Sequence, residues 1–250
     1  MELFSEYFNK KHLLSSIDAR VKIIVALFTL ILVLSYKGFL FPLVIILICA
    51  ALCKIIKVHT KVLLLRYAEP AFIALILVLL KFFFSGTEPL VEIDLRIFAL
   101  TAYKDGLYEG LLLAARILAA VSVVIALGFA TPFTEIMAGL SWFRVPKTLI
   151  EITMFAYRYI FILLEDAIVI YNAQKNRLGY SSIKRGLSSF STLAGSLIIK
   201  AFDHSQKITV SMVQRGYEGD IPFLSQKPFK ANEIIFSILF LTSLGIIWKI

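Results

Sequence analysis

Hydrophobic residues in this chain gather in long uncharged runs that short polar stretches separate. Such runs are typical of helices that cross a membrane, because a helix of about 20 apolar residues, rising about 1.5 Å per residue, spans the hydrocarbon layer. The shortest run, 23–36, is flanked by Arg20 and Lys22, whose long side chains can extend to the membrane–water interface. The pattern predicts an all-α polytopic membrane protein with about five spans: Ile23–Tyr36, Phe39–Cys53, Pro70–Phe84, Leu107–Ala130 and Ile234–Trp248.

The region 131–231 has a different pattern, in which apolar residues recur at helical spacing among charged ones. This periodicity predicts one amphipathic helix over 146–180 and a second from about Ser188 to Gly216. Pro146 suits the first helical position, and Gly179 and Gly216 suit the left-handed residue after a helix end. The uncharged segment 187–199 is an alternative span, but it is short and holds four serines. We therefore expect a cytoplasmic region of long helices.

The composition supports a membrane protein and sets its orientation. The chain is 59% hydrophobic and 17% charged, whereas soluble domains are about a quarter charged. The net charge of +9 is then a signal of topology rather than of nucleic-acid binding. One short loop is basic without an acid, while 85–106 is acidic, which predicts a cytoplasmic N-terminus. The expected layout is a membrane domain over 1–130, a cytoplasmic region over 131–231 and a last span within 232–250.

The two amphipathic helices have matched endings. The first ends in Arg177-Leu178-Gly179 and the second in Gln214-Arg215-Gly216, each near a Tyr. An Arg at a helix C-terminus interacts favourably with the helix dipole. It can also bind a carboxylate of a partner through two parallel hydrogen bonds. The endings therefore indicate either a docking motif or ordinary helix capping.

Three further charged residues are candidates for function. Arg158 and Glu165 lie seven positions apart on the first amphipathic helix, so they share a face. They either brace the crossing of the two helices or are solvated surface charges. Arg116 lies within a predicted span, where an ionisable residue is a functional candidate. It contacts a neighbouring subunit or extends to the interface.

The sequence lacks the usual motifs of nucleotide, metal and hydrolase sites. There is no G-x-x-x-x-G-K-[ST] loop, no H-E-x-x-H and no G-x-S-x-G. The histidines have no metal-ligand spacing, and the two cysteines lie in an apolar run, where packing is the simpler interpretation. We expect this chain to bind no metal or cofactor. The histidines are His12, His59 and His204, and the cysteines are Cys49 and Cys53.

Several short motifs, taken in order, resemble those of a known family. The chain is similar over nearly its whole length to the transmembrane (T) component of energy-coupling factor (ECF) ABC importers, the EcfT/CbiQ family, and most closely to the CbiQ type. Asn176 stands where the family usually has Ala. The motifs are Ile17–Lys22, Glu109–Leu111 with Arg116, Thr131–Pro146, Tyr157–Ile160 and the two Arg-containing endings.

The resemblance implies a non-catalytic coupling subunit in the plasma membrane of a prokaryote. Its partners would be two ABC ATPase subunits, which bind the ATP, and a separate substrate-binding membrane subunit, of the S or CbiM-like kind. Arg177 and Arg215 would contact the ATPases, with Gly179 and Gly216 permitting the helix ends. The helices would transmit ATP-driven motion, and the CbiQ type implies cobalt or nickel uptake.

Other functions remain open at this point. A T component of a vitamin-type ECF importer fits the same residues, because the cargo is chosen by another subunit. A self-sufficient secondary transporter would need ionisable residues near mid-membrane and broken helices, and apart from Arg116 and Lys81 the spans offer no such residue near mid-membrane. A membrane-embedded enzyme would need clustered His, Asp or Ser at the membrane face, and the acids here are scattered.

Overall fold

The computed structural model describes residues 17–85, 89–95, 98–218 and 231–249. Expectations that concern His12, and the acidic Glu88 of the external loop, lie outside this part. The chain forms two compact units. One comprises Met1–Gly139 with Lys227–Ile250, and the other comprises Leu140–Gln226. Each is described by itself.

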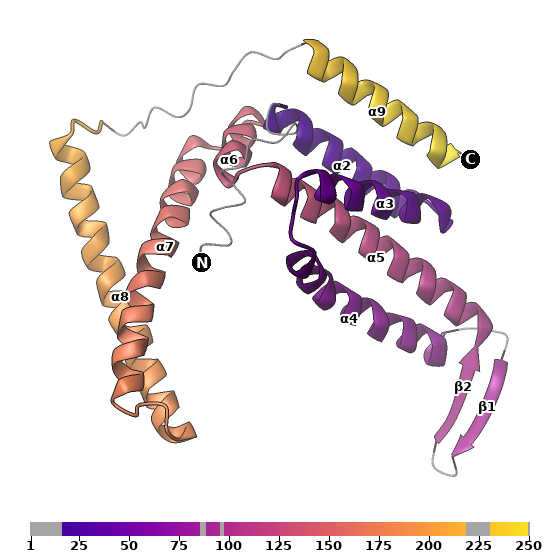
Figure 1. Cartoon of the computed structure of the whole chain (residues 1–250), viewed down its shortest axis with the longest axis horizontal. Helices are drawn as coiled ribbons and strands as arrows, with labels where there is room; N and C mark the ends of the chain where they lie inside the picture. The colour runs from indigo at the N-terminus through magenta and orange to yellow at the C-terminus, as the bar shows by residue number, and fades with distance from the viewer. Residues whose placement is uncertain (1–16, 86–88, 96–97, 219–230, 250) are drawn as a thin grey trace. The chain divides into compact units, whose positions relative to one another are not determined.

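Each of the five predicted spans coincides with a helix in the first unit (Figure 1). Helix α5 is central, because it packs against α2, α3 and α4, while α9 packs against α2. The sequence therefore predicted the position of every long apolar helix. Their bounds are α2 Ala19–Ser35, α3 Leu40–Ile55, α4 Thr60–Phe84, α5 Lys104–Ala130 and α9 Ala231–Lys249.

Helix α4 differs from its prediction, because it begins ten residues earlier. The basic loop is reduced to a turn at which Lys57 has a φ of 59°, and Lys61 and Arg66 lie inside the helix. Pro70 is in the helix interior rather than in its first turn. It removes one backbone hydrogen bond there, a loss that membrane helices tolerate when neighbours satisfy the freed group. The resulting helix has 25 residues.

A two-stranded hairpin connects α4 to α5, within the stretch 85–106 that was expected to be an acidic loop. Strand β1 (Pro89–Leu95) pairs antiparallel with β2 (Phe98–Tyr103), with Leu95 opposite Phe98 and an irregularity near Pro89. The sequence of β1 alternates apolar and acidic residues from Val91 to Leu95, a period of two that favours a strand. The rest of the described chain is helical, in eight helices.

Two glycines allow α5 to lie close to α4. A Cβ atom at Gly106 would overlap the carbonyl oxygens of Lys81 and Ser85, and one at Gly110 would lie 3.1 Å from Val78 Cα. The two glycines are four positions apart, so they lie on one face of the helix. This small-x-x-x-small spacing is a common packing motif of membrane helices. It explains how α4 and α5 form the closest helix pair of the first unit.

Much of the apolar surface of these helices is exposed. In α4 and α5 an 18-residue window has a mean hydropathy of 2.1 and 2.4, and only 6% and 33% of its residues are buried. Among the described helices these two are long and apolar enough to span a membrane, while α3 and the segment Ser237–Lys249 are apolar but shorter. In α4, Leu64 and Leu65 are 70% and 73% exposed. An exposed apolar surface of this kind fits lipid contact.

The second unit is built on two long helices, α7 (Lys147–Asn176) and α8 (Ile183–Gln214), of 30 and 32 residues. Both were predicted, although α8 begins five residues earlier than expected. The earlier start has a cap, because Ser182 Oγ accepts a hydrogen bond from the Arg185 backbone N–H. A short helix that was not predicted, α6 (Phe133–Trp142), precedes α7.

Candidate functional site

Helices α7 and α8 form an antiparallel hairpin whose connecting end, residues 174–189, is called the tip. At the tip, Gln174 Nε2 donates to the Ser189 carbonyl oxygen at 3.0 Å, and Tyr180 Oη donates to Gln174 Oε1 at 2.8 Å. Ser189 Oγ donates to the Gly179 carbonyl oxygen at 3.0 Å. The rings of Tyr171 and Tyr180 pack with centroids 5.0 Å apart. These contacts fix the two helices to each other at the tip.

Helix α7 ends in a Schellman motif, in which backbone N–H groups beyond the helix satisfy its last carbonyls. The Leu178 N–H donates to the Lys175 oxygen at 3.0 Å, and the Gly179 N–H donates to the Gln174 oxygen at 2.9 Å. Arg177 is the cap residue, and the left-handed residue after it is Leu178, with a φ of 59°. The Arg177 side chain is exposed beside this motif.

Helix α8 ends in the same motif. The Gly216 N–H donates to the Val213 oxygen and the Tyr217 N–H donates to the Met212 oxygen, both at 3.0 Å. Arg215 is the cap residue and is exposed, and Gly216 has a φ of 77°. The structure therefore brings the two Arg residues into equivalent positions on equivalent helix ends.

The prediction that Gly179 is the left-handed residue was wrong, whereas the same prediction for Gly216 is confirmed. Leu178 takes that conformation instead, and Gly179 meets a different requirement. A Cβ at Gly179 would lie 2.7 Å from Ser189 Oγ and 2.9 Å from the Gln174 carbonyl oxygen. Gly179 is thus needed for the close approach of the tip, not for its φ.

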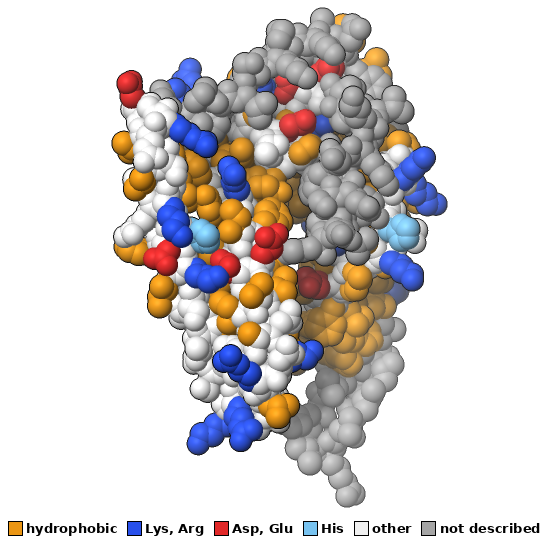
Figure 2. Space-filling view, turned by 60° about the vertical axis from the view of Figure 1, so that its left-hand side comes forward, with side chains coloured by type: hydrophobic (Ala, Val, Ile, Leu, Met, Phe, Trp, Pro, Cys, Tyr) orange, Lys and Arg blue, Asp and Glu red, His pale blue; other side chains and the backbone are white. Residues whose placement is uncertain are grey.

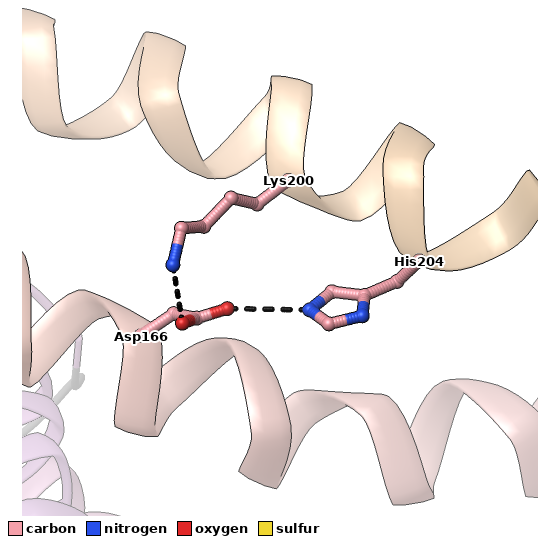
Figure 3. Close-up of polar contacts among 3 residues, drawn as sticks. All are labelled: Asp166, Lys200 and His204. Carbon is pink, nitrogen blue, oxygen red and sulfur yellow. Dashed lines mark hydrogen bonds and ion pairs between the residues drawn. The ribbon is translucent and has the colours of Figure 1, made fainter. Parts of the chain in front are cut away.

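One carboxylate joins the middle of the two helices (Figure 3). Asp166 of α7 accepts a hydrogen bond from Lys200 Nζ at 2.5 Å and lies 3.3 Å from His204 Nε2, both on α8. These two partners hold the pKa of the Asp166 carboxyl below its ordinary value, with the Lys200 hydrogen bond as the main cause. The ring of Tyr159 packs near His204, with centroids 6.2 Å apart. We call Asp166, Lys200 and His204 together the Asp166 bridge.

Beyond the bridge the two helices diverge, as Figure 1 shows, and a hollow of about 740 Å³ opens between them. Aromatic, aliphatic and basic side chains line this hollow. Figure 2 shows hydrophobic side chains gathered between the two helices with Lys and Arg beside them. The lining residues that matter here are Phe155, Arg158, Tyr159, Lys207, Ile208, Ser211, Met212 and Arg215.

Neither of the two predicted bracing residues joins α7 to α8 through an ion pair that the structure describes. Arg158 and Glu165 are both exposed. The inter-helix ion pair that the described residues make uses Asp166, the neighbour of Glu165, in place of either. Arg158 lines the hollow instead. Leu178 is 68% exposed at the tip, and Gln214 is exposed at the last residue of α8.

Arg116 is half-buried in α5 and makes a contact within the chain. Its Nη2 donates to the carbonyl oxygen of Tyr36, the C-cap residue of α2. A cation at this position satisfies an unpaired carbonyl and interacts favourably with the helix dipole. The same guanidinium buries its Nε without a hydrogen-bond partner among the described residues. Arg116 therefore stabilises the junction of α2 and α5.

Sequence reasoning missed the Asp166 bridge. Its three residues lie on two helices, 34 and 38 positions apart, and no local motif relates them. A usable signal did exist, because Lys200 and His204 are four apart, so they face the same side of α8. A search for a carboxylate on the inward face of α7 would then have found Asp166.

No group of three or more His, Cys, Asp or Glu that could hold a metal ion occurs in the described part of the chain. Cys49 and Cys53 are buried in the core of the first unit as free thiols. Their neighbours in that core are apolar side chains such as Phe41, Ile45 and Val123. This environment agrees with a packing role for both cysteines.

Comparison with known proteins identifies relatives over most of the chain. The family model CbiQ, described as "Cobalt transport protein", matches residues 10–227. An uncharacterised protein of Methanocaldococcus jannaschii is 32% identical over 84% of this chain and 79% of its own length. A putative fused cobalt transport protein CbiMQ of Methanocorpusculum labreanum is 40% identical over 43% of this chain and 18% of its own. The energy-coupling factor transporter transmembrane protein EcfT of Staphylococcus aureus is 27% identical over 67% and 66%.

These matches define a class, the transmembrane components of cobalt or energy-coupling factor transporters, which are membrane proteins and not enzymes. Within that class, the chain belongs to the CbiQ family of cobalt transport proteins, because the family model covers most of its length.

Proposed function

We propose that this protein is the coupling subunit of an ECF-type ABC importer. It passes the ATP-driven motion of two ATPase subunits to a separate substrate-binding membrane subunit. The observation that carries the proposal is the pair of equivalent helix ends in the α7–α8 hairpin. Each end presents an exposed Arg beside a Schellman motif. Neither Arg177 nor Arg215 forms an ion pair with a carboxylate in the described part of the chain.

The separation of the two ends supports two partners rather than one. Arg177 is at the tip, and Arg215 is at the far end of α8. A helix of 32 residues is about 48 Å long at 1.5 Å per residue. A single small acidic pocket cannot reach both guanidinium groups, whereas two subunits can each receive one. ATP then binds to those subunits, since this chain has no P-loop.

The membrane arrangement that we propose has five spans, α2, α3, α4, α5 and α9. The N-terminus and residues 131–231 are cytoplasmic. Support comes from the exposed apolar surface of these helices and from the basic residues around the turn between α3 and α4. In this arrangement the α7–α8 hairpin lies on the side where ATP is available.

Cobalt or nickel is the proposed cargo, and a CbiM-like protein is the proposed substrate-binding subunit. The support is the family description and the relative in which CbiM and CbiQ are fused. A T component of a vitamin-type importer is the second candidate, which the similarity to an EcfT protein favours. A self-sufficient secondary transporter is less well supported, because Arg116, an ionisable residue within α5, binds a helix end.

A pull-down with the cognate ATPase pair tests the proposal. The wild-type chain, extracted in mild detergent, is compared with the Arg177→Glu plus Arg215→Glu variant. We expect the wild type to retain the ATPases and the variant to lose at least about tenfold in affinity, because two ion pairs become repulsions.

A control that keeps both Arg residues is Lys184→Glu plus Asp203→Lys, which reverses two exposed charges and leaves the net charge unchanged. If the Arg variant is folded and binds as tightly as the wild type, the Arg residues are only helix caps. If the wild type itself retains no ATPase, the coupling function is refuted.

A further inference from the structure

The first unit contains a cavity of about 130 Å³ between α2, α3 and α5. Helices α2 and α3 both pack against α5 (Figure 1), and one side chain of α9, Phe240, completes the wall. Most of the side chains that line it are apolar. We call this space the inner cavity. Its lining includes Val25, Ala26, Ile48, Leu52, Val123 and Ala126.

The inner cavity is elongated along the helices. Lys22 Nζ donates a hydrogen bond to the Ala130 carbonyl oxygen at 3.1 Å, so the start of α2 meets the end of α5 and the two helices are antiparallel. The lining residues extend from Lys22 to Thr29 on α2 and from Ala130 back to Val123 on α5. Each of these segments covers about 10 Å of helix axis. A long apolar cavity of this kind fits an extended hydrocarbon chain.

Other occupants fit the inner cavity less well. Apolar cavities of about 150 Å³ stay dry and take up apolar guests. The hydroxyl at the wall offers water no free donor, because Thr29 Oγ1 donates to the Val25 carbonyl oxygen at 2.7 Å. A partner helix, which is about 10 Å wide, is too thick to enter. In the proposed membrane arrangement the cavity lies at the depth of the bilayer, where lipid chains are the available apolar guests.

Lys22 gives the inner cavity one polar end. The residue is only 9% exposed, and its ammonium donates to Ala130 but forms no ion pair with a carboxylate that the structure describes. An ammonium has three hydrogen-bond donors, so two are left for a ligand in the cavity. A phosphate oxygen is an acceptor of complementary charge.

The charges around Lys22 indicate which head group fits. Asp18, Glu135 and Glu233 all interact with Lys22 electrostatically. Glu233 Oε2 accepts a hydrogen bond from the Asp18 N–H at 3.0 Å, and Arg20 Nε lies 3.8 Å from Asp18 Oδ1. Three carboxylates and two cations disfavour a purely anionic head group. A head group with a phosphate and a primary ammonium complements both signs of charge.

We propose that the inner cavity binds one membrane phospholipid. A hydrocarbon chain lies between α2, α3 and α5, and a phosphoethanolamine-type head group lies at Lys22. This site rests on the proposed membrane arrangement and not on the coupling of ATPase subunits. Because α5 is the central helix of the first unit, the bound chain contributes to the packing of that unit.

A photoreactive lipid tests the location. The full-length chain is reconstituted into phosphatidylcholine vesicles that contain a little phosphatidylethanolamine with a diazirine in one acyl chain. After irradiation, mass spectrometry maps the labelled peptides. We expect label within 45–56 and 123–130 that excess unlabelled phosphatidylethanolamine removes. The exposed Leu64 and Leu65 of α4 serve as a reference for bulk lipid, whose label should not saturate.

Variants that fill the inner cavity test its occupancy. Ala26→Leu and Ala126→Leu add volume from two different helices. Gly128→Leu is the control, because a Cβ there meets nothing within 4 Å and the residue does not line the cavity. We expect the saturable label to fall at least about tenfold in both filling variants and to persist in the control, since no room remains for the chain. Equal labelling of filling and control variants overturns the proposal.

The head-group assignment has its own test, which adds no volume to the core. Lys22→Gln removes the charge at the polar end, and Lys61→Gln removes an exposed charge of α4 as the control. We expect Lys22→Gln alone to require about tenfold more unlabelled phosphatidylethanolamine for competition, because a hydrogen bond to a charged group is lost. Phosphatidylglycerol that competes as well as phosphatidylethanolamine would overturn the zwitterionic head group.

The outcomes separate this proposal from the proposed function. Label on α4 without saturable label at 45–56 or 123–130 leaves the membrane arrangement standing and overturns the lipid site. A first unit that takes no label at all contradicts the membrane arrangement as well. No ATPase is present in these measurements, so the pull-down remains an independent test of coupling. Unchanged helicity of each variant by circular dichroism excludes misfolding as the cause of lost label.

Discussion

At the scale of single residues, the two equivalent helix ends are built from different amino acids. Gly216 takes the left-handed conformation without strain, whereas Leu178 takes it at a φ of 59°. For a residue with a Cβ atom this conformation costs about 1 kcal/mol or more. Leu178 has little burial to offset this cost, since it is 68% exposed. Its hydrogen-bonded neighbours in the Schellman motif must supply the stabilisation.

Substitution of Leu178 by Gly should therefore stabilise the hairpin. The expected gain is about 0.5 to 1 kcal/mol, because the relief of strain exceeds the extra chain entropy of glycine. Thermal unfolding in detergent measures it. A lower melting temperature for Leu178→Gly would show that the exposed leucine makes a contact of its own.

Gly216→Ala should have the opposite effect and destabilise α8 by about 1 kcal/mol, because alanine is strained at a φ of +77°. Gly195→Ala is the matched control on the same helix. Its added Cβ meets nothing within 4 Å, so higher helix propensity should stabilise by up to about 1 kcal/mol. Melting temperatures that shift in the same direction for both variants would contradict this prediction.

At the scale of elements, the α7–α8 hairpin has three zones along its length. Hydrogen bonds fix the tip, the Asp166 bridge joins the middle, and at the far end the hollow of about 740 Å³ opens between the helices. The sequence predicted both helices, because helical periodicity is a local property. It could not predict the bridge, because Asp166 meets Lys200 only in one register of two helices joined by a turn.

The Asp166 bridge should make the stability of the hairpin depend on pH. The folded pKa of Asp166 is lowered, so its contribution is complete above the ordinary carboxyl pKa of about 3.9 and is lost as pH falls through the folded value. The stabilisation of wild type over Asp166→Asn should therefore shrink from about pH 6 to about pH 3. Thermal unfolding across this range measures the difference.

The control for the bridge is Asp203→Asn, an exposed carboxyl of α8 that forms no ion pair among the described residues. We expect no comparable pH-dependent difference from wild type. An equal pH dependence for both variants would show that the bridge does not stabilise the hairpin.

The packing of α4 against α5 can also be tested by substitution. Gly110→Leu places a side chain where a Cβ already lies 3.1 Å from Val78 Cα. It should destabilise the first unit by about 2 kcal/mol through overpacking. Gly128→Leu on the same helix meets nothing within 4 Å and should have little effect. Unfolding in detergent compares the two, and equal losses would argue against close packing at Gly110.

At the scale of the whole molecule, the chain combines a unit with exposed apolar helices and a unit with a basic helical hairpin. The positions of the long helices could be predicted from the sequence, because uncharged runs and amphipathic periods are each strong signals. The hairpin β1–β2 was missed, since its strands of 7 and 6 residues lie in a stretch interpreted as an acidic loop. Helix α6 was missed because it has only 10 residues.

The position of the Asp166 bridge makes the two Arg ends mechanically unequal. Along α7, Arg177 is about 16 Å from Asp166, and it lies within the fixed tip. Along α8, Arg215 is about 22 Å from Lys200, at the open end. Because the tip is locked, a rotation of about 10° at the bridge displaces Arg215 by about 4 Å and leaves Arg177 nearly in place. In such a rotation the Arg177 end of the hairpin stays in place while the Arg215 end moves.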